Sequence, residues 1–502
     1  MMNRHARIAL TLIGVLVTSL VLPALGGDVP AQLPRPDGQP GDATRPVKVY
    51  ILAGQSNMVG MGEISGAKNP YTAVYLSSEP AAEGPLAIYK VGNYNIAALG
   101  VYTADGKPAD KPIAQGLLEV PQQGIYQVQC GSGDSSICKM ELDGKCVYSR
   151  EASGQPVRKD VTLQSGKRYP FTITGFTGEA PRFWMQKMDL VGYGDLDSTV
   201  KREGKFPWLV DDKGNWTVRK DVYFYDARID FKGSDLLPTY QGKTICPCLG
   251  FGHVMGTFHD EQVLLIKTAM GNRSLGFDFR PPSSGRTDPN NEWESKEYTL
   301  MVEGVHKTLD NIAKVVPGYK GQGYEMAGFV WWQGHKDSFS DDLIAAYEKN
   351  MVNMINDVRK EFKAPKMPAV IATVGFGGHH MAEKFQKIWA AQMAVGDPAK
   401  HPEFAGTVAS VDTRDYWREV DESPTGQDYH YNRNAETYML VGDALGRAMV
   451  SLEGGKAEAL PLAPRPKRAV REEGVEPTEA EKAAALKART PIILDGIIPA
   501  YV

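Results

Sequence analysis

Hydrophobic positions along this chain follow two periods, one typical of buried strands and one of amphipathic helices. Val47–Ala53 is a continuous apolar run rich in β-branched residues, as expected for a strand covered on both faces. Four later runs have the same character: Gln262–Ala269, Ala327–Trp332, Ala369–Val374 and Thr407–Val411. In Asp341–Phe362 apolar residues recur at helical spacing instead. Strands alternating with helices predict a three-layer α/β/α domain with a five-stranded parallel sheet.

One long stretch, residues 63–195, interrupts this alternation. It contains strand-like runs such as Gly124–Gln129 and Arg168–Thr174, separated by turn signals such as Asp143-Gly144. We therefore expect a small β-sandwich-like module inserted into a discontinuous domain formed by residues 46–62 and 196–452. Its aromatic residues alternate with polar ones, as strand positions facing a core do: Tyr126, Tyr148, Tyr169, Phe171 and Phe183. Packing is the default role for these rings, and carbohydrate binding is the alternative.

The two ends of the chain differ in character from the domains between them. Arg4, His5 and Arg7 precede an apolar run, Ile8–Leu22, which small residues follow. This order predicts a secretory signal peptide over residues 1–27 and a mature protein exported from the cytoplasm, in the periplasm or outside the cell, although an uncleaved anchor stays open. Residues 28–45 are rich in Pro, Gly and Asp and predict a flexible lead-in. Residues 453–502 predict a Pro-rich linker and tail of unassigned role.

Charge and cysteine content narrow the range of partners. The 502 residues include 56 Lys and Arg against 60 Asp and Glu, with no block rich in Lys or Arg. This balance argues against a nucleic-acid binder and fits a small, roughly neutral substrate. The cysteines form two groups, Cys130, Cys138 and Cys146, and Cys246-Pro-Cys248, whose pairing the sequence leaves open. Cys-Pro-Cys is not a zinc or redox spacing, so we expect no metal there.

Chemically useful residues follow the predicted strands, at the edge where parallel strands end together. The first strand leads into Gly54-Gln55-Ser56-Asn57, and later strands lead into Met270–Ser274 and Gln333–Asp337. Gln427–His430 precedes the last helical pattern, Ala435–Met449. A serine hydroxyl becomes a nucleophile when a histidine accepts its proton and a third group orients that histidine. These segments therefore contain the parts of an acyl hydrolase.

Four motifs in order make this interpretation specific. Gly54-Gln55-Ser56-Asn57-Met58 resembles the first block of the sialate O-acetylesterase and acetylxylan-esterase family of SGNH hydrolases. Trp331–Asp337 resembles that family's Trp-x-Gln-Gly-Glu-x-Asp block, and Asp428-Tyr429-His430 its terminal Asp-x-His. The region Leu265–Ser283 resembles the second block of bacterial members. The similarity covers about residues 46–62 and 196–452 and leaves the β module outside.

The resemblance implies a role for each matching residue. Ser56 would be the nucleophile and His430 the general base, with Asp428 as the acid that orients it. The oxyanion would be held by the backbone N–H groups of Ser56 and Gly271 and by the side-chain amide of Gln333. Candidate substrate-binding residues are Gln55, Asn57, Asn272, Arg280 and His335.

Two departures from the family pattern leave questions open. His335 stands where the family has glutamate, so the function of that carboxylate must be met differently here. Asp428 lies two residues before the histidine, whereas other SGNH hydrolases place the acid three before, at the position of Gln427. Asp421 is the reserve, and a dyad whose histidine is oriented by a backbone carbonyl is a third possibility.

The resemblance implies hydrolysis of acetyl esters on carbohydrate through an acyl-enzyme, with no cofactor and no metal. The expected partner is an acetylated carbohydrate substrate; neither nucleic acid nor, beyond the signal segment, a membrane is expected. One alternative is another small-ester or arylesterase activity with the same machinery. Another is a non-catalytic carbohydrate-binding protein that kept the fold.

Overall fold

A computed structural model of the chain describes residues 27–65, 74–77, 87–89, 114–120, 123–131, 138–151, 154–175, 182–187, 194–229, 233–419 and 422–462. The expected signal segment before Gly27 and the tail beyond Leu462 lie outside these residues. In the described part of the chain, no helix is long and apolar enough to cross a membrane.

A seven-stranded sheet forms the centre of the larger domain. Its order is β14 (Ser234–Leu236), β13 (Arg219–Asp226), β16 (Val263–Lys267), β1 (Val47–Gly54), β17 (Tyr324–Trp332), β18 (Ala369–Ala372) and β19 (Val408–Val411). Neighbouring strands are parallel, except that β14 pairs antiparallel with β13. The carboxyl ends of the parallel strands therefore lie at one edge of the sheet.

The predicted count of five strands was too low. All five expected runs are strands of this sheet, and β13 and β14 extend it beyond β16. The sequence of β13, Arg-Lys-Asp-Val-Tyr-Phe-Tyr-Asp, begins with three charged residues, and only every second side chain of Val222–Asp226 is buried. A strand that is covered mainly on one face has no continuous apolar run, and that run was the signal used for the other strands.

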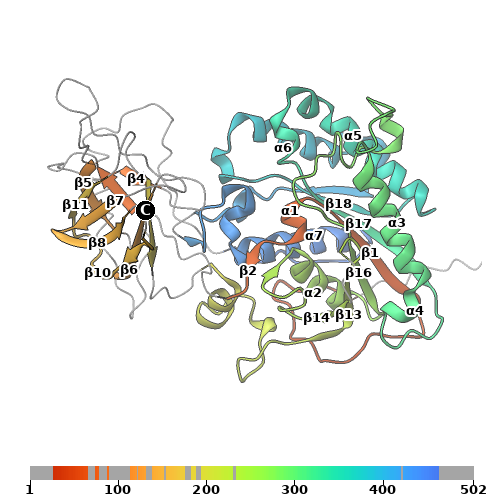
Figure 1. Cartoon of the computed structure of the whole chain (residues 1–502). Helices are drawn as coiled ribbons and strands as arrows, with labels where there is room; N and C mark the ends of the chain where they lie inside the picture. The colour runs from red at the N-terminus through yellow and green to blue at the C-terminus, as the bar shows by residue number, and fades with distance from the viewer. Residues whose placement is uncertain are drawn as a thin grey trace, which may run out of the picture.

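Helices cover both faces of the sheet. They are α1 (Ser56–Val59), α2 (Cys248–Phe258), α3 (Lys296–Asp310), α4 (Ile312–Val315), α5 (Asp341–Glu361), α6 (Glu383–Val395) and α7 (Ala435–Leu452). α2 packs on α7, and α5 packs on α6. Figure 1 shows these two groups on opposite sides of the sheet, with α3 beside α5. The predicted α/β/α layering is confirmed.

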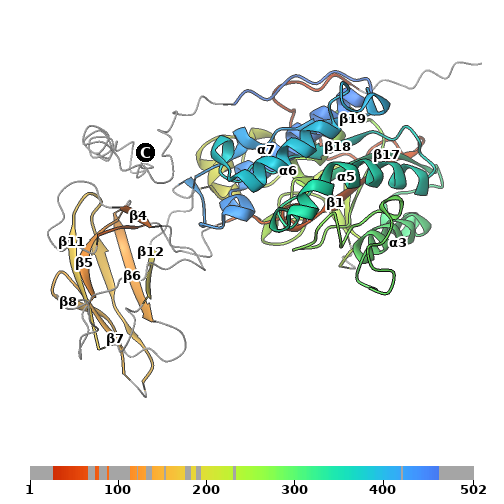
Figure 2. The same cartoon turned by 90° about the horizontal axis from the view of Figure 1, so that it is seen from above.

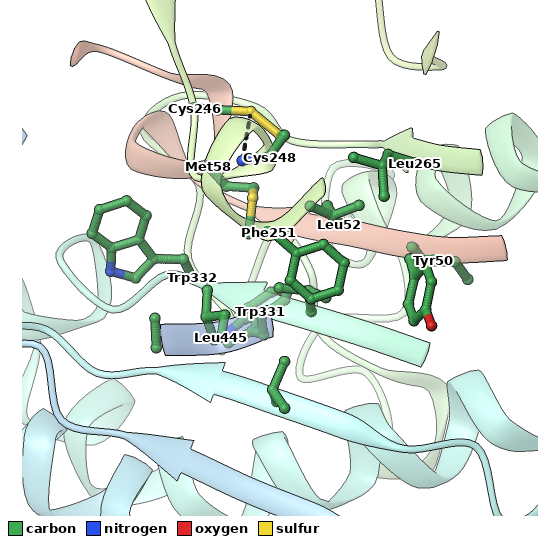
Figure 3. Packing of buried hydrophobic residues seen from close by; sticks show 14 of the residues in the cluster. Tyr50, Leu52, Met58, Cys246, Cys248, Phe251, Leu265, Trp331, Trp332 and Leu445 are labelled. Carbon is green, nitrogen blue, oxygen red and sulfur yellow. Dashed lines mark hydrogen bonds between the residues drawn. A yellow bond between two sulfur atoms is a disulfide. The ribbon is translucent and has the colours of Figure 1, made fainter. Parts of the chain in front are cut away.

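The strand that leads to Ser56 lies in the middle of the core. Tyr50, Ile51 and Leu52 of β1 have no exposed surface, because helices cover both faces of the strand. Trp331 and Trp332 of the neighbouring β17 are equally buried core residues, as Figure 3 shows. A central strand buried in this way provides a rigid support for the residues that follow it.

Residues between Val74 and Lys187 form a separate, all-antiparallel unit (Figures 1 and 2). One sheet contains β10 (Asp160–Leu163), β6 (Gly124–Gly131) and β12 (Arg182–Lys187). The other contains β4 (Ala87–Tyr89), β3 (Val74–Ser77), β5 (Ala114–Glu119), β11 (Tyr169–Thr174), β7 (Cys138–Leu142), β8 (Lys145–Arg150) and β9 (Val157–Arg158). The chain leaves the larger domain and returns to it at one place, because Asp197 donates a backbone hydrogen bond to Ile64 at 2.8 Å.

The described aromatic residues of the β module pack inside it. Tyr126, Tyr148, Tyr169 and Phe171 are buried in a core that is separate from the core of the larger domain. The side chain of Phe183 lies outside the described part of the chain. Packing, and not carbohydrate binding, is therefore the role of these four rings.

The lead-in is not the flexible segment that its composition predicted. Val29 and Leu33 are buried against the larger domain. The guanidinium of Arg447 in α7 donates to the carbonyl groups of Pro30 and Ala31 at 2.9 Å each. Val29 also pairs with Ala457, so the lead-in and the segment after α7 lie side by side. Composition alone could not reveal an arginine 417 residues away that satisfies these carbonyls.

One of the two groups of cysteines contains a disulfide. Cys246 and Cys248 form a disulfide at the start of α2, close to Met58, as Figure 3 shows. The short pair β2 (Gly62–Glu63) and β15 (Thr244–Ile245) lies directly before this disulfide. Of the predicted local pairing among Cys130, Cys138 and Cys146, a disulfide to Cys146 is not formed, because its thiol is free. The side chain of Cys130 lies outside the described residues.

Candidate active site

Ser56 lies at the end of β1, as the first residue of the one-turn helix α1. The chain can turn there only because residue 54 is glycine. Gly54 has φ 149°, and a Cβ at this position would overlap the carbonyl oxygen of Trp332 on the neighbouring strand. The Ser56 side chain is nearly buried, and among the described residues its hydroxyl has no hydrogen-bond partner.

A buried ammonium group holds the far end of the same turn. Lys267, the last residue of β16, donates from Nζ to the carbonyl of Val59 at 2.8 Å and to Gln241 Oε1 at 2.9 Å. Its charge is balanced by Asp226 at 3.0 Å, and the two side chains are 3% and 5% exposed. Burial lowers the pKa of Lys267, and Asp226 opposes that shift. The turn that carries Ser56 is thus fixed at both ends.

Gln333 holds the loop after β17, and its amide is fully used within the protein. Nε2 donates to Asp337 Oδ2 at 2.6 Å, to the Arg273 carbonyl at 2.9 Å and to Gln55 Oε1 at 3.2 Å. Its Oε1 accepts from the hydroxyl of Tyr347 at 3.0 Å. An amide group has only two N–H bonds, so none is left for an oxyanion. The structure therefore gives Gln333 a positioning role in place of the expected oxyanion contact.

Gln55 likewise holds loops together, through its side-chain oxygen. Its side chain is 2% exposed, and Oε1 accepts from the backbone N–H groups of Gly334 and Lys336 at 3.3 and 3.2 Å. Together with the bond from Gln333, these contacts tie the residue before Ser56 to the loop that carries His335. Its Oε1 is thus used within the protein, whereas among the described residues its Nε2 has no partner, so substrate binding by Gln55 stays a prediction.

Gly271 lies beside Ser56. The segment after β16 follows the end of β1, with backbone hydrogen bonds from Thr268 to Leu52 and from Met270 to Gly54 at 2.9 and 3.1 Å. A Cβ placed on Gly271 would be 3.9 Å from that of Ser56. Among the described residues, neither backbone N–H of this pair has an acceptor. Two adjacent unused N–H groups are the arrangement that an oxyanion requires.

Asn272 and Arg280, two other candidates from the second motif, have different roles. Asn272 is exposed in a left-handed conformation, with φ 56°, next to Gly271, so its amide can reach a ligand. Arg280 instead donates to the carbonyls of Gly285, Gly276 and Ser284 and lies 3.3 Å from Glu294. The guanidinium holds its own loop together, and the expectation that it binds substrate is not met.

The loop of His430 is bound to the residue after Ser56. Asn57 Nδ2 donates to the carbonyl of Tyr429 at 3.1 Å, across 372 residues of sequence. The hydroxyl of Tyr438 donates to Asn57 Oδ1 at 2.7 Å and contacts the carbonyl of His430 at 3.2 Å. Asn57 is 3% exposed and joins the two loops. Its side chain is therefore not the substrate contact that the sequence analysis expected. The nucleophile and base loops are brought together by this contact.

The partner of the His430 ring is an amide and not a carboxylate. Nδ1 lies 3.3 Å from Gln427 Oε1, and no other side chain among the described residues bonds to the ring. Asp428, the expected acid, is exposed, and none of the contacts of the His430 ring is with it. It occupies the first position of the 3-10 turn Asp428–Arg433, whereas Gln427 precedes that turn. The reserve candidate, Asp421, lies outside the described residues.

The imidazole of His430 is held in its neutral form. Burial lowers its pKa to about 4, with further contributions from the positive charge of Arg433 and from His335. A neutral ring with Nδ1–H donated to Gln427 leaves Nε2 free to accept a proton. The ring can therefore act as a general base from weakly acidic pH upward.

His335 lies among aromatic rings. It stacks on Phe385 and Tyr429 with ring centroids 5.7 and 5.4 Å apart, and contacts Phe339 and Phe376 edge-on at 5.0 and 5.5 Å. Burial, Lys384 and Lys336 lower its pKa to about 4. Where the family has an anionic glutamate, this chain therefore has a neutral ring in an apolar setting.

Two functional residues were missed from the sequence. Lys267 is part of an apolar strand, and only the tertiary structure shows its contact with Val59. Asp337 is buried and accepts from Leu275 N and Gly276 N at 2.9 and 2.8 Å as well as from Gln333. Burial raises its pKa to about 6. The signal in the sequence was its place at the end of the Gln-Gly-His-Lys-Asp motif, shortly after a strand. A carboxylate in that place could have been predicted to position its neighbours.

Comparison with known families agrees with this architecture. Residues 204–451 match the model of the family described as carbohydrate esterase, sialic acid-specific acetylesterase. The match covers 248 of the 502 residues and agrees, within that segment, with the family resemblance drawn from the motifs; Gly54–Met58 lies outside it. No curated protein sequence matches the chain significantly.

Similar solved structures are distant. One is a protein from Arabidopsis thaliana, at 14% identity over 47% of this chain and 88% of that one, with a TM-score of 0.34. Another is a carbohydrate acetylesterase from Xanthomonas citri, at 13% identity over 68% of this chain and 71% of that one, with a TM-score of 0.33. A third is a carbohydrate esterase family 2 enzyme with a carbohydrate-binding domain from Corynascus thermopiles (Myceliophthora fergusii). It has 14% identity over 72% of this chain and 100% of that one, with a TM-score of 0.27. Similarities this low assign no function.

Proposed function

We propose that this protein is a serine esterase that removes O-acetyl groups from carbohydrate. The observation that carries the proposal is the contact of Asn57 with Tyr429, which places the residue after the candidate nucleophile against the residue before the candidate base. The family match over residues 204–451 supports acetylated carbohydrate as the substrate class.

In the proposed first step, Ser56 Oγ attacks the acetyl carbonyl carbon and its proton passes to His430 Nε2. The carbonyl oxygen becomes an oxyanion, which accepts from the backbone N–H groups of Ser56 and Gly271. Nδ1–H of His430 donates to Gln427 Oε1 throughout and fixes the tautomer. The leaving sugar oxygen then takes the proton from Nε2, and the C–O bond breaks to leave an acetyl-enzyme.

In the second step, water takes the place of the sugar hydroxyl. His430 Nε2 accepts a proton from the water, and its oxygen attacks the acetyl carbon of the acyl-enzyme. Collapse of the oxyanion releases acetic acid, which ionises to acetate in solution, and His430 Nε2 returns its proton to Ser56 Oγ. The residues named perform both steps without any further co-reactant.

Acetate release from acetylated xylan and from O-acetylated sialic acid tests the proposal. The wild-type protein should release acetate from at least one of them, and Ser56→Ala and His430→Ala should abolish release. Ser451→Ala and His306→Ala, at an exposed helix end and an exposed ion pair, are matched controls and should be fully active. Normal release by both active-site variants would overturn the mechanism. A wild type inactive on every ester would favour a carbohydrate-binding protein that kept the fold.

We also propose that the protein is exported through its N-terminal signal segment. The basic residues and the apolar run of the first 22 residues motivate this, and a Cys246–Cys248 disulfide is compatible with an oxidising compartment. N-terminal sequencing of the protein from the periplasm or culture medium should give a start near Asp28. Recovery in the cytoplasm with Met1 or Met2 intact would contradict export.

A further inference from the structure

A group of aromatic residues lies beside the proposed catalytic residues, and neither catalytic step uses it. This aromatic cluster consists of Phe339, Phe385 and Tyr429 around His335. The imidazole of His335 is nearly parallel to the rings of Phe385 and Tyr429, with interplanar angles of 22° and 26°, and the ring of Phe339 is edge-on to it at 84°. Ring pairs at these distances are mutually attractive, so the cluster holds a defined shape.

The cluster is attached to both neighbours of Ser56. His335 precedes Lys336, whose backbone N–H donates to Gln55 Oε1 at 3.2 Å. On the other side, the carbonyl of Tyr429 accepts from Asn57 Nδ2 at 3.1 Å. The stacking of His335 on Tyr429 therefore joins the loops that follow β17 and precede α7 next to the nucleophile. The ring of Tyr429 also contacts that of His430, with ring centroids 4.4 Å apart.

Phe339 and Lys384 form the outer part of the cluster. Phe339, at the end of the short helical turn Asp337–Phe339, is 62% exposed. The ammonium of Lys384 lies 4.3 Å from the centre of its ring and 4.9 Å from that of Phe385. An exposed phenyl ring held in place by a cation and other rings presents an apolar face flanked by a hydrogen-bond donor.

We infer that the aromatic cluster is a subsite for the sugar ring that bears the acetyl group. A pyranose ring has the matching chemistry, because its C–H face is apolar and packs on an aromatic face while its rim consists of hydroxyl groups. The ammonium of Lys384 donates to one of those hydroxyls. This inference rests on the proposed function and names the part of the substrate that the catalytic residues do not touch.

Substrate selectivity tests the inference, with kcat/KM measured on a sugar acetate and on ethyl acetate, which has no ring. The sugar probe is acetylated xylo-oligosaccharide or O-acetylated sialic acid, whichever the wild type deacetylates faster. Phe339→Ala and Phe385→Ala should lower the ratio of the two values about fivefold to tenfold, mainly through KM for the sugar. Phe339→Tyr, which keeps the ring, should restore the ratio. Tyr324→Ala removes a 45% exposed ring at the opposite end of β17 and should leave it unchanged.

Each other outcome overturns the inference in a recognisable way. An unchanged ratio in Phe339→Ala and Phe385→Ala would remove the subsite and leave the proposed esterase intact. An equal fall on both substrates would make the rings part of the catalytic support only. Phenyl acetate serves as a third substrate. If the variants lower kcat/KM for phenyl acetate relative to ethyl acetate, and not kcat/KM for the sugar acetate, the subsite binds an aryl group. A wild type that hydrolyses ethyl acetate but no sugar acetate would overturn both this subsite and the carbohydrate substrate.

Discussion

The turn that carries Ser56 and the loop that carries His430 are held in different ways. The Ser56 turn continues directly from a central buried strand, and the Lys267 ammonium fixes its last carbonyl. The His430 loop has three consecutive non-glycine residues with positive φ, Tyr431, Asn432 and Arg433 at 49°, 52° and 58°. Each such residue costs about 1–2 kcal/mol of backbone strain.

Tertiary contacts offset the strain in the His430 loop. Tyr431 is fully buried, Asn432 Nδ2 donates to the Arg418 carbonyl at 3.0 Å, and Arg433 pairs with Glu63 at 2.5 Å. The proposed nucleophile is thus held by regular structure, and the proposed base by long-range contacts around an irregular backbone. The surroundings of Ser56 can therefore be predicted from the local sequence, whereas the surroundings of His430 depend on distant residues.

Removing the Ser56 hydroxyl or the His430 imidazole should have the largest effect on kcat, and the two losses should be equal. Ser56→Ala and His430→Ala are each expected to lower kcat about 10⁴-fold or more, and the double variant should fall no further. The reason is that the hydroxyl and the imidazole act in one proton transfer. Acetate release under single-turnover conditions measures this. Additive losses would mean that the two residues do not act on the same step.

The support of the Ser56 turn is tested by removing its buried ion pair as a whole. Lys267→Met/Asp226→Leu should lower kcat about 10- to 100-fold with KM little changed, because the N–H of Ser56 loses its fixed direction. Replacing both partners avoids an unpaired buried charge.

A second buried ion pair is the matched control for that experiment. Arg447→Met/Asp443→Leu removes a pair whose side chains are 8% and 4% exposed and which lies under the lead-in. Melting temperature should fall in both double variants, and kcat only in the first. If kcat falls equally in both, Lys267 has a structural role alone.

The support of His430 is tested at Gln427. Gln427→Glu places a carboxylate on Nδ1, which should raise the pKa of His430 and move the acid limb of kcat/KM up by about one pH unit or more. Gln427→Leu should lower kcat about tenfold or more, because nothing then selects the tautomer. Asp428→Asn should behave as the wild type. A large loss in Asp428→Asn with a normal Gln427→Leu would restore Asp428 as the acid.

The last prediction, with the smallest change in rate, is the dependence of wild-type kcat/KM on pH. Because burial lowers the pKa of His430 to about 4, the ring stays neutral at all higher pH values and loses its function as a base only below that value. We expect the limb of kcat/KM that is due to His430 to fall as pH drops through about 4. A limb near 6.5 would show that the imidazolium is stabilised by an acid.

The strand pattern was sufficient for most of the fold and for the position of the nucleophile. Five buried strands, the helix Asp341–Glu361 and Ser56 at the end of the first strand all follow from local periodicity. The strand β13 was missed because it begins with three charged residues and its apolar part is only Val-Tyr-Phe-Tyr. Asn57 and Arg280 were expected to face substrate but bond within the protein, and the type of a polar residue does not show which way its side chain points.

By itself, the sequence determined the α/β class, the family resemblance and the identity of the expected nucleophile and base. Each of these depends on residues that are close together in the chain, where hydrophobic period and short motifs carry the information. The tertiary structure alone decided that Gln333 and Gln55 bond to each other, that Gln427 faces His430 and that Lys267 supports the Ser56 turn. Such choices depend on which buried polar groups meet across the fold, because each must find a partner there.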